Sequence, residues 1–400
     1  MKAGTSCGKE LIILTEHFWP STGATAQLVK DLADDLHAQG CCLRVLTSTP
    51  GPDCLHYPVQ RFSGYRQVSV GIVGKLTEGV HFLLGSTFWL LRYGHTGHGL
   101  FIVSNPPFIG LVGPLLAFCK RLPYVFLLQD VFPRSATLTG VLPAKGPVVW
   151  LWRELLALVL NQSRVTVVLS SSMLSRCRQE FGDKASLVSI PNWAVVPTSS
   201  RLKSSNPLAL QWGVESVFAV QYSGNFGRLH DILTILEAAR LIQDHPIRFV
   251  FVGGGAKRAQ ILAYCEAYDL SNVIVQPYQP RDQLELSLTA CDLSLVSLIP
   301  GSEDTVAPSK FYGILASSRP VLLIANRDSE LALLIDQEEC GVVVEQGDVG
   351  GLSDALLMLQ ANPELVTRMS ERAGALYRKQ FGRQQSTAAY LQLLRQCQLI

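Results

Sequence analysis

The sequence has few charged residues and lacks the short motifs of several large enzyme classes. Only 16% of its 400 residues are Asp, Glu, Lys or Arg, and the formal net charge is +2. No RNA- or DNA-binding signature occurs, so we expect no nucleic-acid partner. Neither a Walker phosphate loop nor a nucleophile elbow occurs, which argues against P-loop nucleotide hydrolases and α/β-hydrolases.

The usual metal and redox signatures are also missing. No Asp-x-Asp pair is present to hold a divalent ion against a diphosphate. The ten cysteines include no C-x-x-C pair, so neither a zinc site nor a disulfide framework is predicted. His95 and His98 have metal-like spacing, but no acidic residue stands near them, and we interpret them as part of a loop. We therefore expect no metal and no other cofactor.

No apolar run is long enough to cross a bilayer, and the first ten residues contain no signal-peptide h-region, so a cytoplasmic chain is expected. Residues 81–121 nevertheless mix apolar, aromatic and basic side chains, among them Phe88, Trp89, Arg92 and Lys120. Such a mixture suits reversible, peripheral contact with the inner face of the plasma membrane. Helices buried against a sheet would explain the same apolar residues equally well.

The length suits two domains, and each half of the chain alternates strand and helix patterns. In the first half, the predicted strands are 11–15, 43–47, 100–103, 124–128, 165–169 and 187–190, and the predicted helices are 25–37, 110–118 and 148–161. Alternation of this kind predicts a parallel sheet with right-handed crossovers.

A polar stretch near residues 196–207 interrupts the pattern and indicates a linker. Beyond it, the predicted strands are 217–222, 248–252, 273–276, 293–299 and 321–325, and the predicted helices are 232–241, 260–268, 311–316 and 384–399. We therefore predict an α/β protein with two Rossmann-like, doubly wound parallel-sheet domains facing a cleft, where a ligand is expected. The predicted parts are a first domain at 1–197, a linker at 198–207, a second domain at 208–382, and a C-terminal helix at 383–400 that packs back toward the first domain.

The segment 299–325 is the most informative about function. A buried strand leads into a polar loop that contains Glu303, and a short apolar helix then begins near Ser309 and Lys310. In a parallel sheet this junction lies at the carboxyl ends of the strands, where ligands bind. A helix N-terminus together with an ammonium group favours an anionic ligand such as a diphosphate. An ordinary crossover with a solvated loop is the alternative.

Two glycine-rich loops follow neighbouring predicted strands of the second half. One is Tyr-Ser-Gly-Asn-Phe-Gly-Arg at 222–228, and the other is Gly-Gly-Gly at 253–255. Glycines let a backbone approach a ligand closely, and successive N–H groups can hold phosphate. Either loop alone is equally consistent with a tight turn, but together with 299–325 they predict a nucleotide-diphosphate pocket. We assign the donor to Gly224, Asn225, Gly227, Arg228, Gly253, Gly254, Tyr278 and Ser309.

Polar groups also follow two strands of the first half. Gly23 and Ala24 stand in the turn after the first strand, and Gln129 and Asp130 follow the strand at 124–128. A carboxylate at such a strand end can orient or deprotonate a hydroxyl group. We assign Gly23, Ala24 and Gln129 to an acceptor site, and Asp130, Lys310 and Glu303 to catalysis. For Asp130, a helix cap or a turn is the competing interpretation.

The motifs together resemble the family-4 glycosyltransferases of the GT-B fold, over essentially the whole chain. The similar segments are L-Q-D-V-F-P-R-S-A (128–136), V-V-L-S-S-S-M (167–173), I-P-N-W (190–193), Y-S-G-N-F-G (222–227), F-V-G-G-G (251–255) and A-P-S-K-F-Y-G-I-L-A-S-S-R-P-V (307–321). Within that family, the bacterial exopolysaccharide and O-antigen transferases are the most similar. The resemblance implies metal-independent, retaining sugar transfer, with the donor mainly on the second domain and the acceptor on the first.

The sequence departs from the family pattern at several site positions. Of the usual pair of glutamates, Glu303 is present, but Gly313 stands where the second, ribose-holding glutamate is expected. Asn225 and His230 replace the usual arginine and lysine of the phosphate loop, and Gln129 replaces a histidine. Lys310 and Arg228 are then the expected sources of positive charge.

The predicted activity is transfer of a sugar from a nucleoside-diphosphate sugar to a polysaccharide or glycan intermediate, which we expect to be lipid-linked. A nucleotide-sugar 2-epimerase of the same fold is an alternative enzyme. A degenerate transferase that acts as a scaffold in a glycan-assembly complex is the non-enzymatic alternative.

Overall fold

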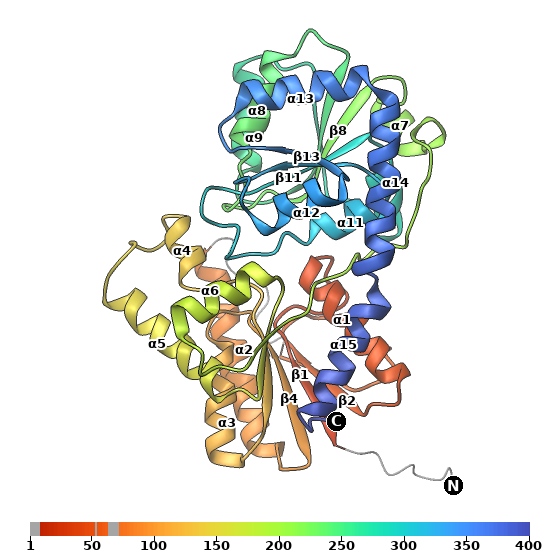
Figure 1. The fold of residues 1–400 in the computed structure, drawn as a ribbon. Coiled ribbons are helices and arrows are strands. Elements are labelled where there is room, and N and C mark those ends of the chain that lie inside the picture. Colours follow the sequence, from red (N-terminus) through yellow and green to blue (C-terminus); the bar gives the residue numbers. More distant parts are fainter. Residues whose placement is uncertain (1–8, 53, 63–71) are drawn as a thin grey trace. The chain divides into compact units, whose positions relative to one another are not determined.

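The computed structural model describes residues 9–52, 54–62 and 72–400, so most of the amino-terminal stretch considered above lies outside the described residues. The chain forms two compact units (Figure 1). Unit 1 comprises Met1–Pro191, Thr305–Ala307 and Gln384–Ile400, and unit 2 comprises Asn192–Asp304 and Pro308–Arg383. The two units are described separately below.

Unit 1 is built on a seven-stranded sheet in the order β3-β2-β1-β4-β5-β6-β7, and every neighbouring pair in it is parallel. Its strands are β1 (Glu10–Leu14), β2 (Leu43–Thr47), β3 (Val59–Arg61), β4 (His98–Val103), β5 (Tyr124–Leu127), β6 (Val165–Val168) and β7 (Leu187–Ser189). The central strands are apolar along their whole length because a doubly wound sheet is covered on both faces. All residues of β4, for example, are buried.

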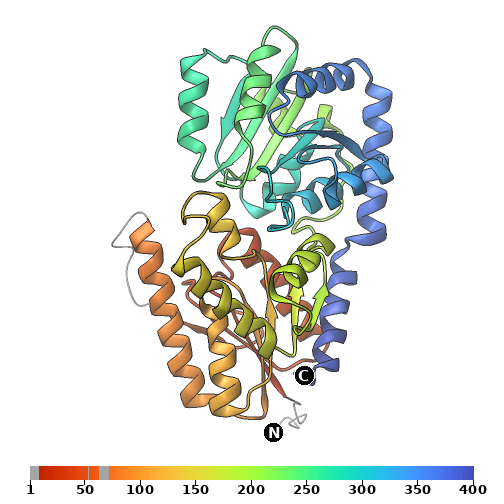
Figure 2. The ribbon, with the colours of Figure 1, turned by 60° about the vertical axis from the view of Figure 1, so that its left-hand side comes forward.

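Helices cover both faces of this sheet (Figure 1). They are α1 (Ala24–Ala38), α2 (Ile72–Tyr93), α3 (Val112–Lys120), α4 (Arg134–Leu138), α5 (Pro147–Gln162), α6 (Ser171–Phe181) and α15 (Arg383–Gln396). The helices α2, α3 and α5 lie side by side in one layer (Figure 2). Among the described residues, none of the helices is long and apolar enough to cross a membrane.

Unit 2 repeats the architecture with a six-stranded sheet in the order β10-β9-β8-β11-β12-β13, again parallel throughout. Its strands are β8 (Phe218–Asn225), β9 (Ile247–Gly254), β10 (Val273–Gln276), β11 (Leu293–Ser297), β12 (Val321–Ile324) and β13 (Gly341–Val344). Its helices are α7 (Pro207–Trp212), α8 (Leu233–Leu241), α9 (Arg258–Ala267), α10 (Leu284–Thr289), α11 (Lys310–Ala316), α12 (Glu330–Glu338), α13 (Val349–Ala361) and α14 (Pro363–Gln380).

Two parallel α/β sheets confirm the predicted fold class. The predicted strands differ from the observed ones by at most three residues at either end, because continuous apolar runs mark strands that are buried on both faces. Several elements were not predicted, and two of them, α2 and α14, are long: they are the strands β3 and β13 and the helices α2, α4, α6, α7, α10, α12, α13 and α14. The 305–307 tripeptide belongs to unit 1, which no sequence pattern suggested.

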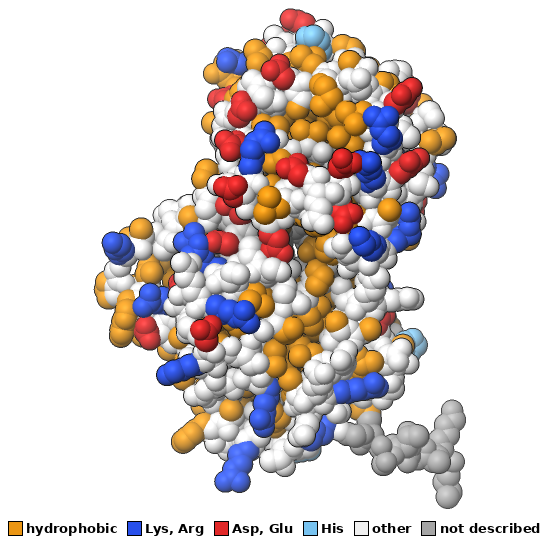
Figure 3. All heavy atoms as spheres, in the orientation of Figure 1, with side chains coloured by type: hydrophobic (Ala, Val, Ile, Leu, Met, Phe, Trp, Pro, Cys, Tyr) orange, Lys and Arg blue, Asp and Glu red, His pale blue; other side chains and the backbone are white. Residues whose placement is uncertain are grey.

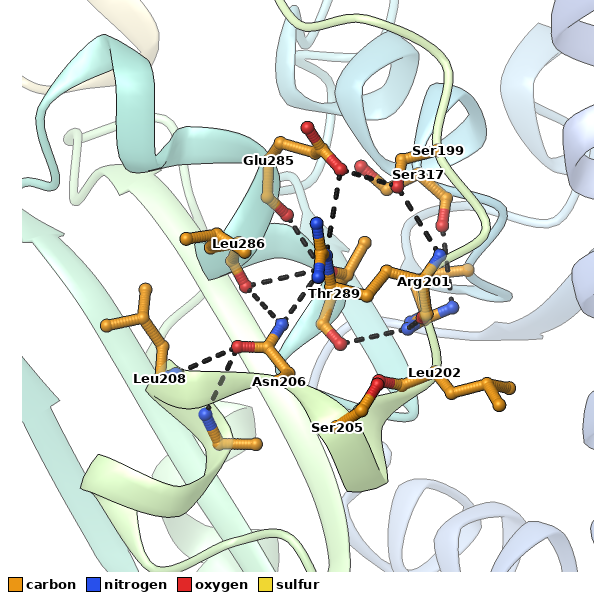
Figure 4. A network of polar contacts seen from close by, with 12 residues as sticks. Ser199, Arg201, Leu202, Ser205, Asn206, Leu208, Glu285, Leu286, Thr289 and Ser317 are labelled. Atoms are coloured by element: carbon orange, nitrogen blue, oxygen red, sulfur yellow. Dashed lines mark hydrogen bonds and ion pairs between the residues drawn. The ribbon is translucent and has the colours of Figure 1, made fainter.

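The predicted linker is docked firmly on unit 2. Asn206 is completely buried and stands at the N-cap of α7, where its Oδ1 accepts hydrogen bonds from the Leu208 N–H at 2.9 Å and the Ala209 N–H at 3.4 Å. Its Nδ2 donates to the Leu286 carbonyl at 2.8 Å and to the Thr289 hydroxyl at 2.9 Å (Figure 4). One amide thus joins the linker to both α7 and α10.

Arg319 strengthens the same attachment from the other side. Its guanidinium is buried and donates to the Cys291 carbonyl at 2.7 Å, the Thr289 carbonyl at 2.9 Å and the Arg201 carbonyl of the linker at 2.7 Å. Nearby, the Ser199 hydroxyl donates to Glu285 Oε1 at 2.7 Å (Figure 4). Segment 199–206 is therefore a fixed part of unit 2.

We expect Asn206→Ala to lower the free energy of unfolding by about 2–3 kcal/mol, since it removes a helix cap and leaves the buried Leu286 carbonyl without its donor. Chemical denaturation measures this change. The matched control is Ser205→Ala, one residue away on the exposed side, which should change stability by no more than about 0.5 kcal/mol. Equal effects of the two substitutions would contradict the assigned role of Asn206.

Candidate functional site

The carboxyl edge of the unit 2 sheet contains a point where the direction of winding reverses. From β8 the chain passes to β9 and β10 on one side, whereas β11, β12 and β13 lie on the other side. Ligands of open α/β sheets bind in the crevice outside such a switch point. The loops after β8, β9 and β11 meet there, so the three segments singled out in the sequence come together at one edge.

The glycines after β8 and β9 are required first of all by the two strands themselves. Gly224 pairs with Gly253 in the parallel register, and a Cβ atom on Gly253 would lie 2.0 Å from the Gly224 carbonyl oxygen. A Cβ atom on Gly255 would lie 2.3 Å from Asn225 Oδ1. The φ angles of Gly224, Gly253 and Gly255 are +116°, +139° and +134°, a region that side chains disfavour. Close backbone packing therefore explains these glycines without a ligand.

Tyr278 and Arg228 take different positions around these loops. The Tyr278 hydroxyl donates to the Gly254 carbonyl at 3.1 Å, although half of the residue is exposed. Tyr278 thus closes one side of the glycine loops. Arg228 is exposed on the loop after β8, and Gly227 lies beside Asn225 and the His230 ring.

Lys310 is the most unusual group at this edge. Its Nζ atom is buried, has no hydrogen-bond partner, and lies 3.6 Å from the ring centroid of Tyr222, which is itself only 1% exposed. Its Cε is 3.9 Å from the position of a Cβ on Gly224, so the side chain runs beneath the glycine loop. Burial holds the pKa of the Lys310 amine well below its usual value.

His230 lies on the other side of this amine and is fixed by the end of β11. Its Nδ1 is 2.8 Å from the Ser297 carbonyl oxygen. Because a carbonyl can only accept, Nδ1 carries the hydrogen and the neutral ring keeps Nε2 as an acceptor. Burial is the main cause that lowers the pKa of His230 to about 3. His230 is therefore neutral at physiological pH and cannot replace the positive charge of the lysine expected at this position.

Two further groups, Ser309 and Lys257, lie near Lys310 or His230. Ser309 occupies the N-cap position of α11, but its side chain makes no capping hydrogen bond because its backbone is already helical. The Lys257 Nζ donates to the His230 carbonyl at 2.6 Å. Lys257 thus supports the loop that carries His230.

Glu303 is held by the ends of the next two strands. Its Oε1 accepts hydrogen bonds from Gln346 Nε2 at 2.7 Å and from the Asn326 N–H at 3.2 Å. Asn326 follows β12 and Gln346 follows β13. Glu303 therefore connects the loop after β11 to the carboxyl ends of these two strands. This arrangement gives Glu303 a scaffold role, while its assignment to catalysis stays a prediction.

In unit 1, the residues assigned to the acceptor meet at the corresponding edge of the sheet. Gly23 is the N-cap of α1, Ala24 is its first residue, and both are exposed. Gln129 Oε1 accepts a hydrogen bond from the Thr25 hydroxyl at 2.9 Å, which joins the start of α1 to the end of β5. Because β1 has β2 on one side and β4 on the other, this edge is also a switch point.

Asp130 lies next to Gln129 at the mouth of a small aromatic pocket. The pocket encloses about 20 Å³, room for about one water molecule, and includes Phe108, Phe132 and Trp152 among its lining residues. Phe132 stacks on Trp152 with a centroid distance of 5.4 Å. Burial raises the pKa of the Asp130 carboxyl to about 6. A carboxyl group with this pKa changes its charge just below neutral pH, as a group that handles protons requires.

Sequence reasoning named neither Tyr222 nor Ser297 as a site residue, although both are buried beside Lys310 or His230. The available signal was that Tyr222 opens the glycine-rich segment 222–228 and that Ser297 lies at the end of β11. In the part of the chain that the structure describes, no three His, Cys, Asp or Glu side chains gather closely enough to hold a metal ion.

Two family models match the chain, one on each unit. A model described as "Glycosyl transferase 4-like domain" matches residues 23–193, and one described as "Glycosyl transferases group 1" matches residues 215–375. Among curated proteins, "Probable glycosyltransferase WbjE" of Pseudomonas aeruginosa is 29% identical over 60% of this chain. WcaI of Escherichia coli (strain K12), a glycosyl transferase named for colanic acid biosynthesis, is 27% identical over 50% of it. The chain spans 60% and 51% of the lengths of these two relatives.

Solved structures with the same fold cover nearly the whole chain. Sucrose-phosphate synthase from Thermosynechococcus elongatus superimposes with a TM-score of 0.77 at 18% identity, over 97% of this chain and 98% of that one. Anabaena HepE in complex with UDP-glucose has a TM-score of 0.75 at 14% identity, over 97% of this chain and 100% of that one. At such identities the likeness concerns the fold alone. Taken with the two family models, it places this chain among the family-4 glycosyltransferases of the GT-B fold.

Proposed function

We propose that the protein transfers a sugar from a nucleoside-diphosphate sugar to a glycan or lipid-linked intermediate. The observation that carries the proposal is Lys310, a buried amine without a partner at the switch point of the unit 2 sheet. An unpaired donor at such a place needs an anion to complete it, and a diphosphate supplies oxygen atoms of the required charge. Unit 2 is then the donor unit, and UDP-glucose bound to the fold relative HepE is a precedent for this ligand class.

The proposed chemistry is retaining and independent of a metal ion. As the bond between sugar and diphosphate breaks, negative charge grows on the departing phosphate, and Lys310 with the N–H groups of the glycine loops stabilises it. Asp130 orients the acceptor hydroxyl on unit 1, and the departing phosphate accepts the proton of that hydroxyl. The protein contributes positioning and electrostatic stabilisation, with no covalent intermediate on a side chain.

A thermal-shift screen with UDP-, GDP- and ADP-sugars tests the donor part of the proposal. A ligand at one hundred times its dissociation constant stabilises the folded state by about 2.7 kcal/mol. We expect one class of nucleotide sugar to raise the melting temperature and the free sugars to leave it unchanged. No shift with any nucleotide sugar would contradict the proposal.

We further propose that unit 1 contacts an anionic membrane surface through the layer of α2, α3 and α5. Exposed apolar side chains crowd this layer: Val80, Leu84 and Phe88 on α2, Leu115 and Phe118 on α3, and Val148, Trp150 and Leu151 on α5. Phe118 is 88% exposed and Phe88 is 73% exposed. Hydrophobic side chains with Lys and Arg among them are visible over α4 and α5 (Figure 3).

The charges on these helices suit such a surface. Arg92, Arg121 and Lys145 are exposed at or near the ends of the same layer, whereas Arg153 lies within α5 and pairs with Glu154 at 3.6 Å. Trp89, in contrast, is half-buried beneath the Arg44 guanidinium, which lies 5.6 Å from its ring, and so contributes less than the sequence suggested. Apolar side chains at headgroup depth and cations beside anionic lipid together give reversible binding.

Flotation with anionic liposomes checks this contact. We expect the protein to float at low salt and to be released at high salt, because screening weakens the electrostatic part of the binding. Phe88→Glu with Phe118→Glu should abolish flotation, whereas Leu241→Glu, a 63% exposed position of unit 2, should not. A wild-type protein that stays wholly at the bottom at low salt would contradict the proposal.

A further inference from the structure

The Lys310 amine is a buried group that lacks the charge partner usually found beside a buried lysine. Its Nζ has no hydrogen bond, and among the residues that the structure describes no carboxylate forms an ion pair with it. It lies over the face of the Tyr222 ring, at 3.6 Å from the centroid. An ammonium ion kept from water in this way loses its hydration with little in return, whereas a neutral amine does not.

The titratable groups on the neighbouring elements do not supply a negative charge. Tyr222, on β8, is buried, and burial raises its pKa, which keeps the phenol neutral. His230 is neutral and donates Nδ1–H to the Ser297 carbonyl. Lys257, at the start of α9, adds further positive charge, and its Nζ is bound by the His230 carbonyl.

The acids nearest to this cluster are engaged elsewhere. Asp231 accepts hydrogen bonds from the Thr234 N–H at 3.2 Å and the Thr234 hydroxyl at 2.6 Å, so it serves the start of α8. Glu303 accepts from Gln346 and from the Asn326 N–H on the far side of β11. Tyr278 donates its hydroxyl to the Gly254 carbonyl. The site therefore offers donors without a resident counter-charge.

We propose that Lys310 is a neutral amine in the empty site and takes up one proton from solution when the diphosphate of a donor enters. The amine nitrogen gains the proton, becomes an ammonium group and donates to phosphate oxygens, so binding and protonation occur together. This inference rests on the proposed function, because it requires that a nucleoside diphosphate binds at this edge of unit 2. It adds a step that a permanently charged arginine in the same place would not have.

Proton uptake has two measurable consequences. Binding that takes up one proton weakens about tenfold for each unit of pH rise within the range where the empty site is neutral and the filled site is charged. The heat of binding also depends on the ionisation enthalpy of the buffer, because the buffer supplies the proton. At pH 8 the terminal phosphate of UDP or GDP is already ionised, since its pKa is about 6, so it contributes little to this exchange.

The experiment is isothermal titration of the full chain with UDP and with GDP at pH 8, in HEPES and in Tris buffer. We expect uptake of about one proton by the wild-type protein. Lys310→Arg should bind without uptake, because guanidinium is always charged. Lys310→Met should bind about 10- to 100-fold more weakly, also without uptake, through loss of a charge-assisted hydrogen bond.

His230→Asn is the matched control for the identity of the proton acceptor. Its amide can still donate to the Ser297 carbonyl, but it cannot titrate, so uptake should persist. Loss of uptake in this variant, or persistence in Lys310→Met, would overturn the inference. Wild-type binding with no buffer dependence would overturn it too while leaving the proposed function intact. No binding of either nucleotide would overturn both.

Discussion

Lys310→Ala is expected to reduce the turnover of sugar transfer by about 100- to 1000-fold. Removal of one donor that stabilises charge developing in a transition state typically costs this much, about 3–4 kcal/mol. The Lys310 interaction with the bound donor grows stronger as the bond to the diphosphate breaks, so kcat should fall, and KM should rise because the contact in the bound donor is lost as well. Steady-state kinetics with a saturating donor measure it.

The same variant should remain folded and should be at least as stable as the wild type without ligand. An unpaired amine buried against Tyr222 does not stabilise the folded protein without a ligand. Its removal should therefore not lower the free energy of unfolding. Arg368→Ala, at an exposed position of α14, is the matched control and should change neither turnover nor stability. Turnover of Lys310→Ala within threefold of wild type would show that the charge lies elsewhere, and Arg228 would be tested next.

Asp130→Asn is expected to reduce transfer by about 100-fold or more, because the acceptor hydroxyl loses the carboxylate that orients it. The wild-type enzyme should also lose activity as the pH falls through about 6, because the buried Asp130 carboxyl becomes protonated at the pKa of about 6 that burial imposes on it. The charged form, present above this pH, is the active one. A pH profile of kcat/KM measures the acidic limb.

The Asp130→Asn variant tests whether the Asp130 carboxyl causes the acidic limb of the pH profile. In Asp130→Asn the residual activity should lack the acidic limb at pH 6, while Asp183→Asn, at an exposed position of unit 1, should keep both the limb and the full rate. An unchanged acidic limb in Asp130→Asn would assign the titration to another group. An unchanged rate would remove Asp130 from the catalytic residues.

The sequence was sufficient to predict the fold and the edge at which the site lies. Strands buried on both faces leave continuous apolar runs, and their order of appearance predicts a parallel sheet. Residues that directly follow such runs, Gly224, Gly253 and Gln129, therefore had to lie at carboxyl edges, and the structure places them there.

The orientation of the site side chains could not be predicted from the sequence. A lysine at the start of a short helix normally extends into solvent, yet the Lys310 amine is buried over the Tyr222 ring, 3.6 Å from its centroid. Lys257, just before α9, likewise donates to a backbone carbonyl, which the sequence does not indicate. The exposure of apolar side chains on α5, such as Trp150, was not predictable either. Helix periodicity alone does not show which neighbouring elements cover a helix face.

The most direct test of the proposed activity is release of nucleoside diphosphate from a nucleotide sugar with and without an added lipid-linked glycan acceptor. The account predicts release that requires the acceptor, a glycosylated product that keeps the anomeric configuration of the donor, and loss of both in Lys310→Ala. Conversion of the nucleotide sugar to its 2-epimer without an acceptor would contradict it in favour of an epimerase. Binding of the nucleotide sugar with no turnover on any acceptor would contradict it in favour of a scaffold.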